Sequence, residues 1–207
     1  MAKQRSKISE RLIGMGDSHL DNFSFFCAAT CRIPGATSYG LMNDNSDTRA
    51  REAFKGFLSA FPNYIPLLCL GEVDCNSLPW RRSMKGSPIH SVYSSIDNLY
   101  FFLREIDRKF ILPSVILPPV DSYKGLGVRS HVTSDKEERT FLVHLYNRLL
   151  KEMSAKQGHH YLDITTQTMN KSGLVNSEYI ISKSDVHLDP SKLYPIVRLQ
   201  LDGVSYV

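Results

Sequence analysis

The sequence lacks any long hydrophobic run. No stretch approaches the ~18 consecutive apolar residues that a membrane-spanning helix needs. The apolar stretch that follows the basic N-terminal residues Lys3, Arg5 and Lys7 is also too short for a secretory signal peptide. These absences exclude a spanning helix, and they lead us to expect a cytoplasmic protein, or one module of a larger protein, with no membrane span.

Cysteine is scarce, and its spacing argues against a metal site. The four cysteines are Cys27, Cys31, Cys69 and Cys75. They form no Cys-x-x-Cys pair, and no histidine lies near them at the spacing of a zinc site. We therefore expect mostly reduced, buried thiols and no bound metal.

The chain also lacks a concentrated basic segment. Its 25 lysines and arginines outnumber its 21 acidic residues, giving a net charge of +4, but they are spread along the sequence. Dense clusters occur only in the first seven residues and at Arg81-Arg82. This distribution gives little support to nucleic-acid binding, and we expect no nucleic-acid partner.

Internal repeats, low-complexity tracts and domain linkers are absent as well. The chain has 207 residues, of which 42% are hydrophobic, and this is enough to bury one sizeable core. We therefore expect residues 1–207 to form a single domain.

What the sequence does contain is an alternation of apolar, strand-like segments and amphipathic, helical ones. Strands are predicted at 11–16, 23–32, 63–70, 112–117 and 161–164, and helices at 46–61, 89–110 and 133–156. Ser134 and Glu137 fit a capping box for the last helix, and the glycine-rich segment 121–132 predicts a loop over a site. The alternation indicates an α/β protein with a parallel sheet, helices on both faces, and functional residues after the strands.

A polar turn, Gly16-Asp17-Ser18-His19, follows the first predicted strand. A serine in a strand-to-helix turn exposes its hydroxyl, but it is a poor nucleophile until a histidine takes its proton and a carboxylate orients that histidine. Ser18 is therefore our candidate nucleophile. Asp17 is better suited to hold the turn by accepting hydrogen bonds from neighbouring amides.

The polar segment near the C-terminus supplies a candidate general base. His187 lies two residues after Asp185, the nearest upstream carboxylate, which we predict orients the imidazole. Asp189 is an alternative acid, and a Ser-His pair without an acid is a third possibility.

Two glycine-bearing turns lie between these segments. Gly35 in Ile-Pro-Gly-Ala-Thr-Ser would let the backbone approach a substrate carbonyl oxygen closely, and Gly40 is a rival for that role. Gly71 belongs to Leu-Gly-Glu-Val-Asp-Cys-Asn, residues 70–76. Turns of this kind present backbone N–H donors to the oxyanion of an acyl-transfer reaction.

In this order, the four blocks resemble those of the SGNH/GDSL hydrolase family. The segments LGEVDCNSLPWRR, GATSYGLMNDNS and EERTFLVHLYNRLL extend the resemblance to a subgroup often met beside glycan biosynthesis, whose third block reads Gly-Glu-(Ile/Val)-Asp-Cys. Together with the four blocks, these segments are spread over most of the chain, from Gly16 to His187. The resemblance implies a three-layer α/β/α sandwich around a five-stranded parallel sheet, flavodoxin-like in its wiring.

The resemblance also implies an oxyanion hole. The family uses the amide of the nucleophile, a second-block glycine and a third-block asparagine, which here gives Ser18, Gly35 and an asparagine near Gly71. The chain departs from the pattern because Val73 stands where that asparagine should be. The amide would then come from Asn76, or from Asn43.

The fifth block of the family reads Asp-x-x-His, which would put the acid at position 184, where this chain has serine. Asp185 takes that role in our prediction. In the third block, we expect Glu72 and Asp74 to accept backbone N–H bonds and to pair with Arg81 or Arg82, with direct substrate contact as the alternative.

The function implied by the resemblance is serine-dependent hydrolysis or transfer of an O-acyl ester, an acetyl group on a carbohydrate or glycan precursor, with no cofactor. The carbohydrate rests on the resemblance alone, since a fold does not fix a substrate.

Two other functions stay open. The runs Asp17-x-His19-x-Asp21 and Asp185-x-His187-x-Asp189 look like metal ligands, as in a metallophosphoesterase-like hydrolase. The Asn-His-Asp turn that such an enzyme shows after a later strand is missing from this sequence. The second alternative is a non-catalytic glycan-binding or assembly module.

Overall fold

The computed structural model describes residues 11–81, 86–121, 132, 134–182 and 185–204. Five parallel strands form one sheet in the order β2-β1-β3-β4-β5. Their bounds are Leu12–Gly16 (β1), Ala29–Arg32 (β2), Ile65–Cys69 (β3), Ile111–Pro113 (β4) and His160–Leu162 (β5). This is the strand order of flavodoxin-like folds, so the predicted fold class is confirmed.

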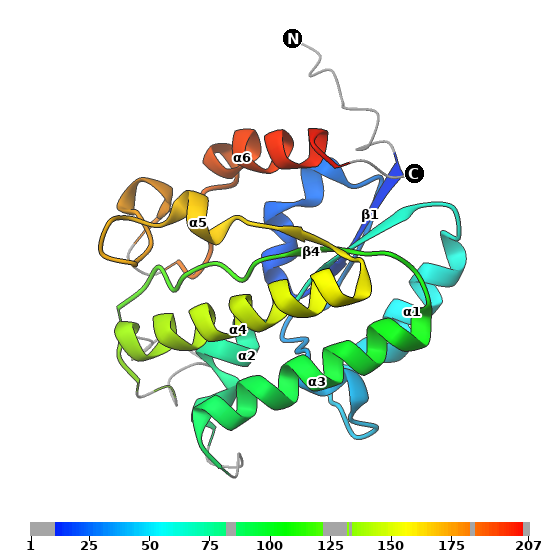
Figure 1. The fold of residues 1–207 in the computed structure, drawn as a ribbon, viewed down its shortest axis with the longest axis horizontal. Coiled ribbons are helices and arrows are strands. Elements are labelled where there is room, and N and C mark those ends of the chain that lie inside the picture. The colour runs from blue at the N-terminus through cyan, green and yellow to red at the C-terminus, as the bar shows by residue number, and fades with distance from the viewer. Residues whose placement is uncertain (1–10, 82–85, 122–131, 133, 183–184, 205–207) are drawn as a thin grey trace.

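Helices cover both faces of the sheet, which Figure 1 shows with α6 on one side and α1, α3 and α4 on the other. The α-helices are Ala50–Ala60 (α1), Glu72–Asn76 (α2), Pro88–Ile106 (α3), Lys136–Gln157 (α4), Thr165–Thr168 (α5) and Pro190–Asp202 (α6). Short 3-10 turns are Ser18–Asn22 (η2), Ser24–Phe26 (η3), Tyr39–Met42 (η4), Leu78–Trp80 (η5) and Ser177–Tyr179 (η7). The molecule is thus a three-layer sandwich.

The interior strand β1 is apolar on both faces because helices lie above and below it. All five of its residues are buried. On the helices, a single stripe faces inward: in α3, Val92, Ile96, Leu99 and Leu103 are buried at intervals of three and four residues. Burial of these stripes against the sheet is what holds the layers together.

The register of the strands places three loops at one edge of the sheet. Gly16, the last residue of β1, is opposite Arg32 of β2 and Cys69 of β3. The segments that follow these three strands therefore leave the sheet side by side. They carry Ser18 and the two glycine-bearing turns.

All five strands are shorter in the structure than predicted, and two of the differences have a clear physical reason. Phe23–Phe26 was expected in a strand but lies in and before η3, closed by a backbone bond from the Phe26 N–H to the Phe23 carbonyl at 3.0 Å. β4 ends at Pro113 instead of Leu117 because the backbone N–H and carbonyl of Val115 bond to a side chain and not to a neighbouring strand. Asn147 accepts from the Val115 N–H at 2.7 Å and donates to its carbonyl at 2.8 Å.

The capping box of α4 is shifted by one residue from the prediction. Asp135 caps the helix, and Glu138 closes the box by accepting from the Asp135 N–H. Most of the expected loop 121–132 lies outside the described residues. Among the helices that are described, none is long and apolar enough to cross a membrane.

Candidate active site

Ser18 lies directly beyond the carboxyl end of β1, as the sequence predicts. It begins η2, and its side chain is half-buried. Asp17 caps this turn from a fully buried position, where its Oδ1 accepts from the His19 N–H at 2.8 Å. Asp17 therefore has the turn-supporting contact that we expected, and it fixes the backbone on both sides of the serine.

His187 and Asp185 are joined by two hydrogen bonds. Oδ1 of Asp185 lies 2.9 Å from both the backbone nitrogen and Nδ1 of His187. Burial opposes ionisation of Asp185, but the bonds from His187 outweigh it and hold the pKa of this carboxyl below its usual range. Nε2 of His187 is buried and makes no hydrogen bond to a described residue. The imidazole is thus oriented by a carboxylate, with one nitrogen left to accept a proton.

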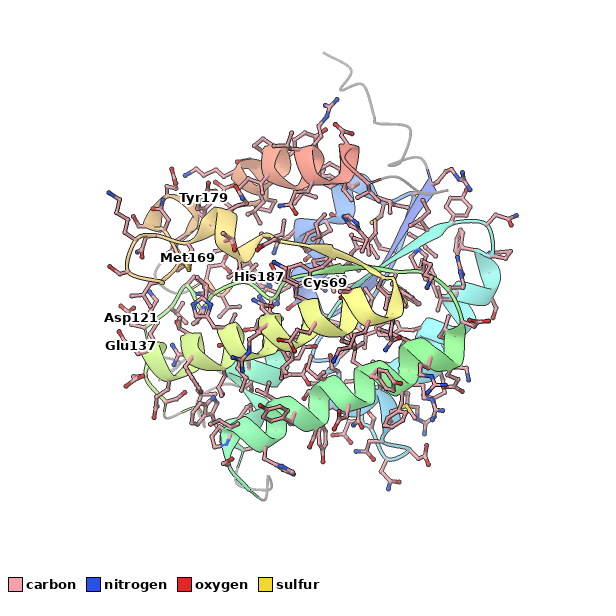
Figure 2. The ribbon with its side chains drawn as sticks, in the orientation of Figure 1. Cys69, Asp121, Glu137, Met169, Tyr179 and His187 are labelled. Atoms are coloured by element: carbon pink, nitrogen blue, oxygen red, sulfur yellow. The ribbon has the colours of Figure 1, made fainter. Side chains whose placement is uncertain are left out.

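His19 brings the segment that carries His187 against the serine turn. Its Nε2 lies 3.2 Å from the Val186 carbonyl oxygen, and its ring centroid lies 4.6 Å from that of His187. His19, the residue next to Ser18, therefore contacts the candidate base directly. On its other side, the serine turn is bonded to β3, since the Asp17 N–H donates to the carbonyl of Cys69 at 3.2 Å. Figure 2 labels Cys69 and His187.

Sequence reasoning considered His19 only as part of a metal-ligand run and missed this contact. The sequence does contain a signal for this contact, because a histidine other than His187, namely His19, directly follows the candidate nucleophile. Burial lowers the pKa of His19, but the Glu72 carboxylate, with help from Asp17 and the Val186 carbonyl, raises it to about 9.

Gly35 and Asn43 lie on the same exposed loop surface. Gly35 has a φ of 78°, a conformation that favours glycine, and nothing within 4 Å would meet a side chain there. Both residues line a cavity of about 200 Å³, together with Gly40 and Arg81. The second-block glycine and one of the two candidate asparagines thus share one open pocket.

Asn76, the other candidate asparagine, is buried in α2. Its Nδ2 donates to Oε1 of Glu72 at 3.2 Å, a bond within one helical turn. Val73 is also buried. The structure therefore places the Asn76 amide in the protein interior, whereas Asn43 is exposed.

Asp74 joins the third block to the second. Its Oδ2 accepts from the Ser38 N–H and its Oδ1 from the Tyr39 N–H, both at 2.9 Å. Complete burial raises the pKa of Asp74 to about 6, although these hydrogen bonds act in the opposite direction. Asp74 therefore holds the loop after Gly35 instead of facing solvent, and Arg82, one of its expected partners, lies outside the described residues.

Gly71 is required where α2 begins. Its φ is 115°, and a Cβ there would lie 2.5 Å from the Val115 side chain and 2.6 Å from the Tyr146 ring. The Tyr146 hydroxyl in turn is 2.6 Å from the hydroxyl of Ser38. The absence of a side chain at Gly71 thus lets Tyr146 of α4 approach closely, and Tyr146 in turn contacts Ser38 in the loop that follows Gly35.

One set of buried side chains has the composition of a metal site. Asp17, His19 and Glu72 offer ligand atoms that all lie within 4.8 Å of one another. Asp21 and Asp189, which belonged to the ligand runs considered from sequence, are used elsewhere. Asp21 pairs with Arg32 at 3.0 Å, and Asp189 caps α6 by accepting from the Ser191 N–H at 2.9 Å.

No family model and no curated protein sequence matches the chain significantly. Solved structures do. A proposed acylhydrolase from Bacteroides fragilis is 15% identical, with 97% of this chain and 88% of that chain aligned, and a TM-score of 0.61. A GDSL-like lipase from Bacteroides thetaiotaomicron is 14% identical, with 98% and 92% aligned and the same TM-score of 0.61.

The OSK domain of Drosophila Oskar is also similar, at 12% identity, 93% and 88% coverage and a TM-score of 0.58. These likenesses show that the chain has the fold of GDSL and SGNH hydrolases. Because a domain that is not named as a hydrolase shares the fold, the case for chemistry has to come from the site.

The role of Asp74 can be tested by stability. Replacing Asp74 by alanine removes the acceptors of one buried and one partly buried backbone N–H group, so we expect the free energy of unfolding to fall by about 3 kcal/mol. Asp47→Ala, which removes an exposed carboxylate from the nearby loop, should change it by less than about 0.5 kcal/mol. Urea denaturation of both variants measures this, and equal midpoints would contradict the role assigned to Asp74.

Proposed function

We propose that this chain is a serine acylhydrolase in which Ser18 is the nucleophile and His187 the general base. The observation that carries the proposal is the contact of the His187 segment with the serine turn, through the Val186 carbonyl and the ring of His19. The imidazole of His187 is oriented by a carboxylate and has an unbonded Nε2, and its segment contacts the residue that follows a half-buried serine at a strand end. The names of the similar lipase and acylhydrolase support ester chemistry.

The reaction would proceed by acyl transfer through the enzyme. His187 Nε2 accepts the proton of Ser18 Oγ as Oγ bonds to the carbonyl carbon of the ester. Collapse of the tetrahedral intermediate breaks the bond to the alcohol oxygen, and His187 returns the proton to this leaving group. Water, or an acceptor hydroxyl, then gives its proton to His187 and attacks the acyl-enzyme. The bond between the acyl carbon and Ser18 Oγ breaks, the acyl group is released, and His187 returns the proton to Oγ. Asp185 stabilises the imidazolium at Nδ1.

The oxyanion would be held by the amides of Ser18 and Gly35 and by one side-chain amide. Asn76 and Asn43 are the two candidates. We favour Asn43 because it lines the same open cavity as Gly35, whereas the Asn76 amide donates to Glu72 inside the protein.

We further propose that the substrate is an acetyl ester of a carbohydrate or glycan precursor. The cavity beside Gly35 supports a polar substrate, since its side chains are rich in hydroxyl and amide groups that can bond to sugar hydroxyls. They are those of Thr37, Tyr39, Asn43, Asn45, Ser46, Asp47, Thr48 and Arg81, with a single apolar side chain, Leu78.

The proposal predicts that Ser18→Ala loses at least ~10³-fold in kcat on a short-chain activated ester, since the nucleophile is removed. Ser24→Ala is the matched control, because Ser24 lies on the next turn and bonds to the Asp21 carbonyl. A panel of acyl esters, acetylated sugars and phosphate monoesters identifies the substrate class. Equal rates for wild type and Ser18→Ala, or turnover of phosphate esters alone, would refute a serine esterase.

Asp185→Asn should lower kcat by at least ~10²-fold, because the imidazolium loses its negative partner. Asp189→Asn tests the alternative acid, and it should leave kcat nearly unchanged because Asp189 is the cap of α6. Steady-state kinetics of both variants decide the assignment. A loss confined to Asp189→Asn would transfer the role to that residue, and no loss in either would favour a Ser-His pair.

Asn43→Ala should reduce kcat by ~10²-fold with little change in KM, because one oxyanion donor contributes ~3 kcal/mol to transition-state stabilisation. Asn76→Ala should act mainly on the melting temperature, since its amide bonds within α2. A kcat loss in Asn76→Ala alone would reverse our preference, and normal turnover in both would leave only backbone donors.

A further inference from the structure

The buried ring of His19 has one nitrogen whose role is fixed. A backbone carbonyl only accepts hydrogen bonds, so the contact of Nε2 with the Val186 oxygen at 3.2 Å requires a hydrogen on Nε2. Histidines that bind a metal through one nitrogen commonly donate the other N–H to a carbonyl or carboxylate in this way.

The other nitrogen, Nδ1, faces two carboxylates. It lies 3.4 Å from Oδ1 of Asp17 and 3.7 Å from Oε2 of Glu72, and it makes no hydrogen bond. Oδ2 of Asp17 is also buried without a hydrogen bond. Asp17 is 0% exposed, and His19 and Glu72 are each 3% exposed, so bulk water does not compensate these atoms.

We propose that Asp17, His19 and Glu72 bind a divalent cation of the zinc class. Zinc lies about 2.1 Å from nitrogen and oxygen ligands in a tetrahedral site, so two of its ligands are separated by about 3.4 Å. The separations of Nδ1 from the two carboxylate oxygens match that spacing and exceed the usual length of an N–H···O bond. Imidazole and carboxylate together suit zinc better than magnesium.

A small cavity lies at these side chains. It has a volume of about 10 Å³, and Asp17, His19 and Glu72 line it together with Asn22, whose Nδ2 is likewise buried without a hydrogen bond. This space suits a single ion or one water molecule.

The ion would join three parts of the chain that meet beside Ser18. Asp17 and His19 belong to the serine turn, Glu72 to α2, and the carbonyl bonded to His19 to the segment that carries His187. The site is independent of ester chemistry, because none of its ligands is a reacting group in the proposed reaction. Metal binding is therefore measured without any ester present.

The test uses the full chain, freed of metal by dialysis against a chelator and then titrated with Zn²⁺ or Mg²⁺ in a calorimeter. We expect one Zn²⁺ per chain, a higher melting temperature with Zn²⁺, and no comparable binding of Mg²⁺. Bound Co²⁺ should give the visible spectrum of a tetrahedral ion without a thiolate charge-transfer band, which separates this site from one at the cysteines.

His19→Gln and Glu72→Gln should each weaken Zn²⁺ binding by at least ~10²-fold, since loss of an outer contact alone costs 10- to 100-fold. His159→Gln, a change to a half-buried histidine on the far side of the fold, is the control. Failure of the folded wild type to bind Zn²⁺, a thiolate band with Co²⁺, or equal binding by both variants and wild type would overturn the proposal. If His19→Gln or Glu72→Gln does not fold, the wild-type stoichiometry and Co²⁺ spectrum still decide it.

Discussion

The candidate site depends on one hydrogen bond between distant parts of the chain. Nε2 of His19 and the Val186 carbonyl are 167 residues apart in sequence and 3.2 Å apart in the structure. The same segment is also held by packing, since Val186 contacts the cluster of Val120 and Val132 and Leu188 is buried in the main core. The imidazole of His19 therefore joins the turn of the proposed nucleophile to a segment that the core already holds in place.

The parallel sheet explains why the remaining parts converge. Because β1, β2 and β3 end in register, the turn with Ser18, the loop with Gly35 and the start of α2 leave the same edge. Asp74, in α2, then holds the loop that follows Gly35, because its carboxylate accepts from the N–H groups of Ser38 and Tyr39. The buried carboxylates of Asp17 and Asp74 accept from backbone N–H groups and so hold these loops in place around the proposed nucleophile and base.

Much of this could be predicted from sequence, because strand alternation and strand-end motifs are local signals. The parallel sheet, the place of Ser18 and the pairing of Asp185 with a residue two positions away belong to this group, whereas the strand order was implied by the family resemblance. Short apolar runs are ambiguous between a strand and a helical turn, so residues 23–26 predict a strand where the structure has a 3-10 turn. Ser134-Asp135 and Glu137-Glu138 offer a capping box in two adjacent registers, and the structure uses the second. The His19 contact and the Asn147 bonds to Val115 depend on tertiary packing, which no local pattern encodes.

The central claim is that Ser18 is a nucleophile activated by His187. Reaction with a fluorophosphonate, followed by mass spectrometry of the peptides, tests this most directly, because such reagents phosphonylate an activated serine without needing the natural ester. The account predicts a single adduct on Ser18 that is lost in His187→Ala. An adduct on another residue, no adduct on the folded protein, or equal labelling of His187→Ala would contradict it.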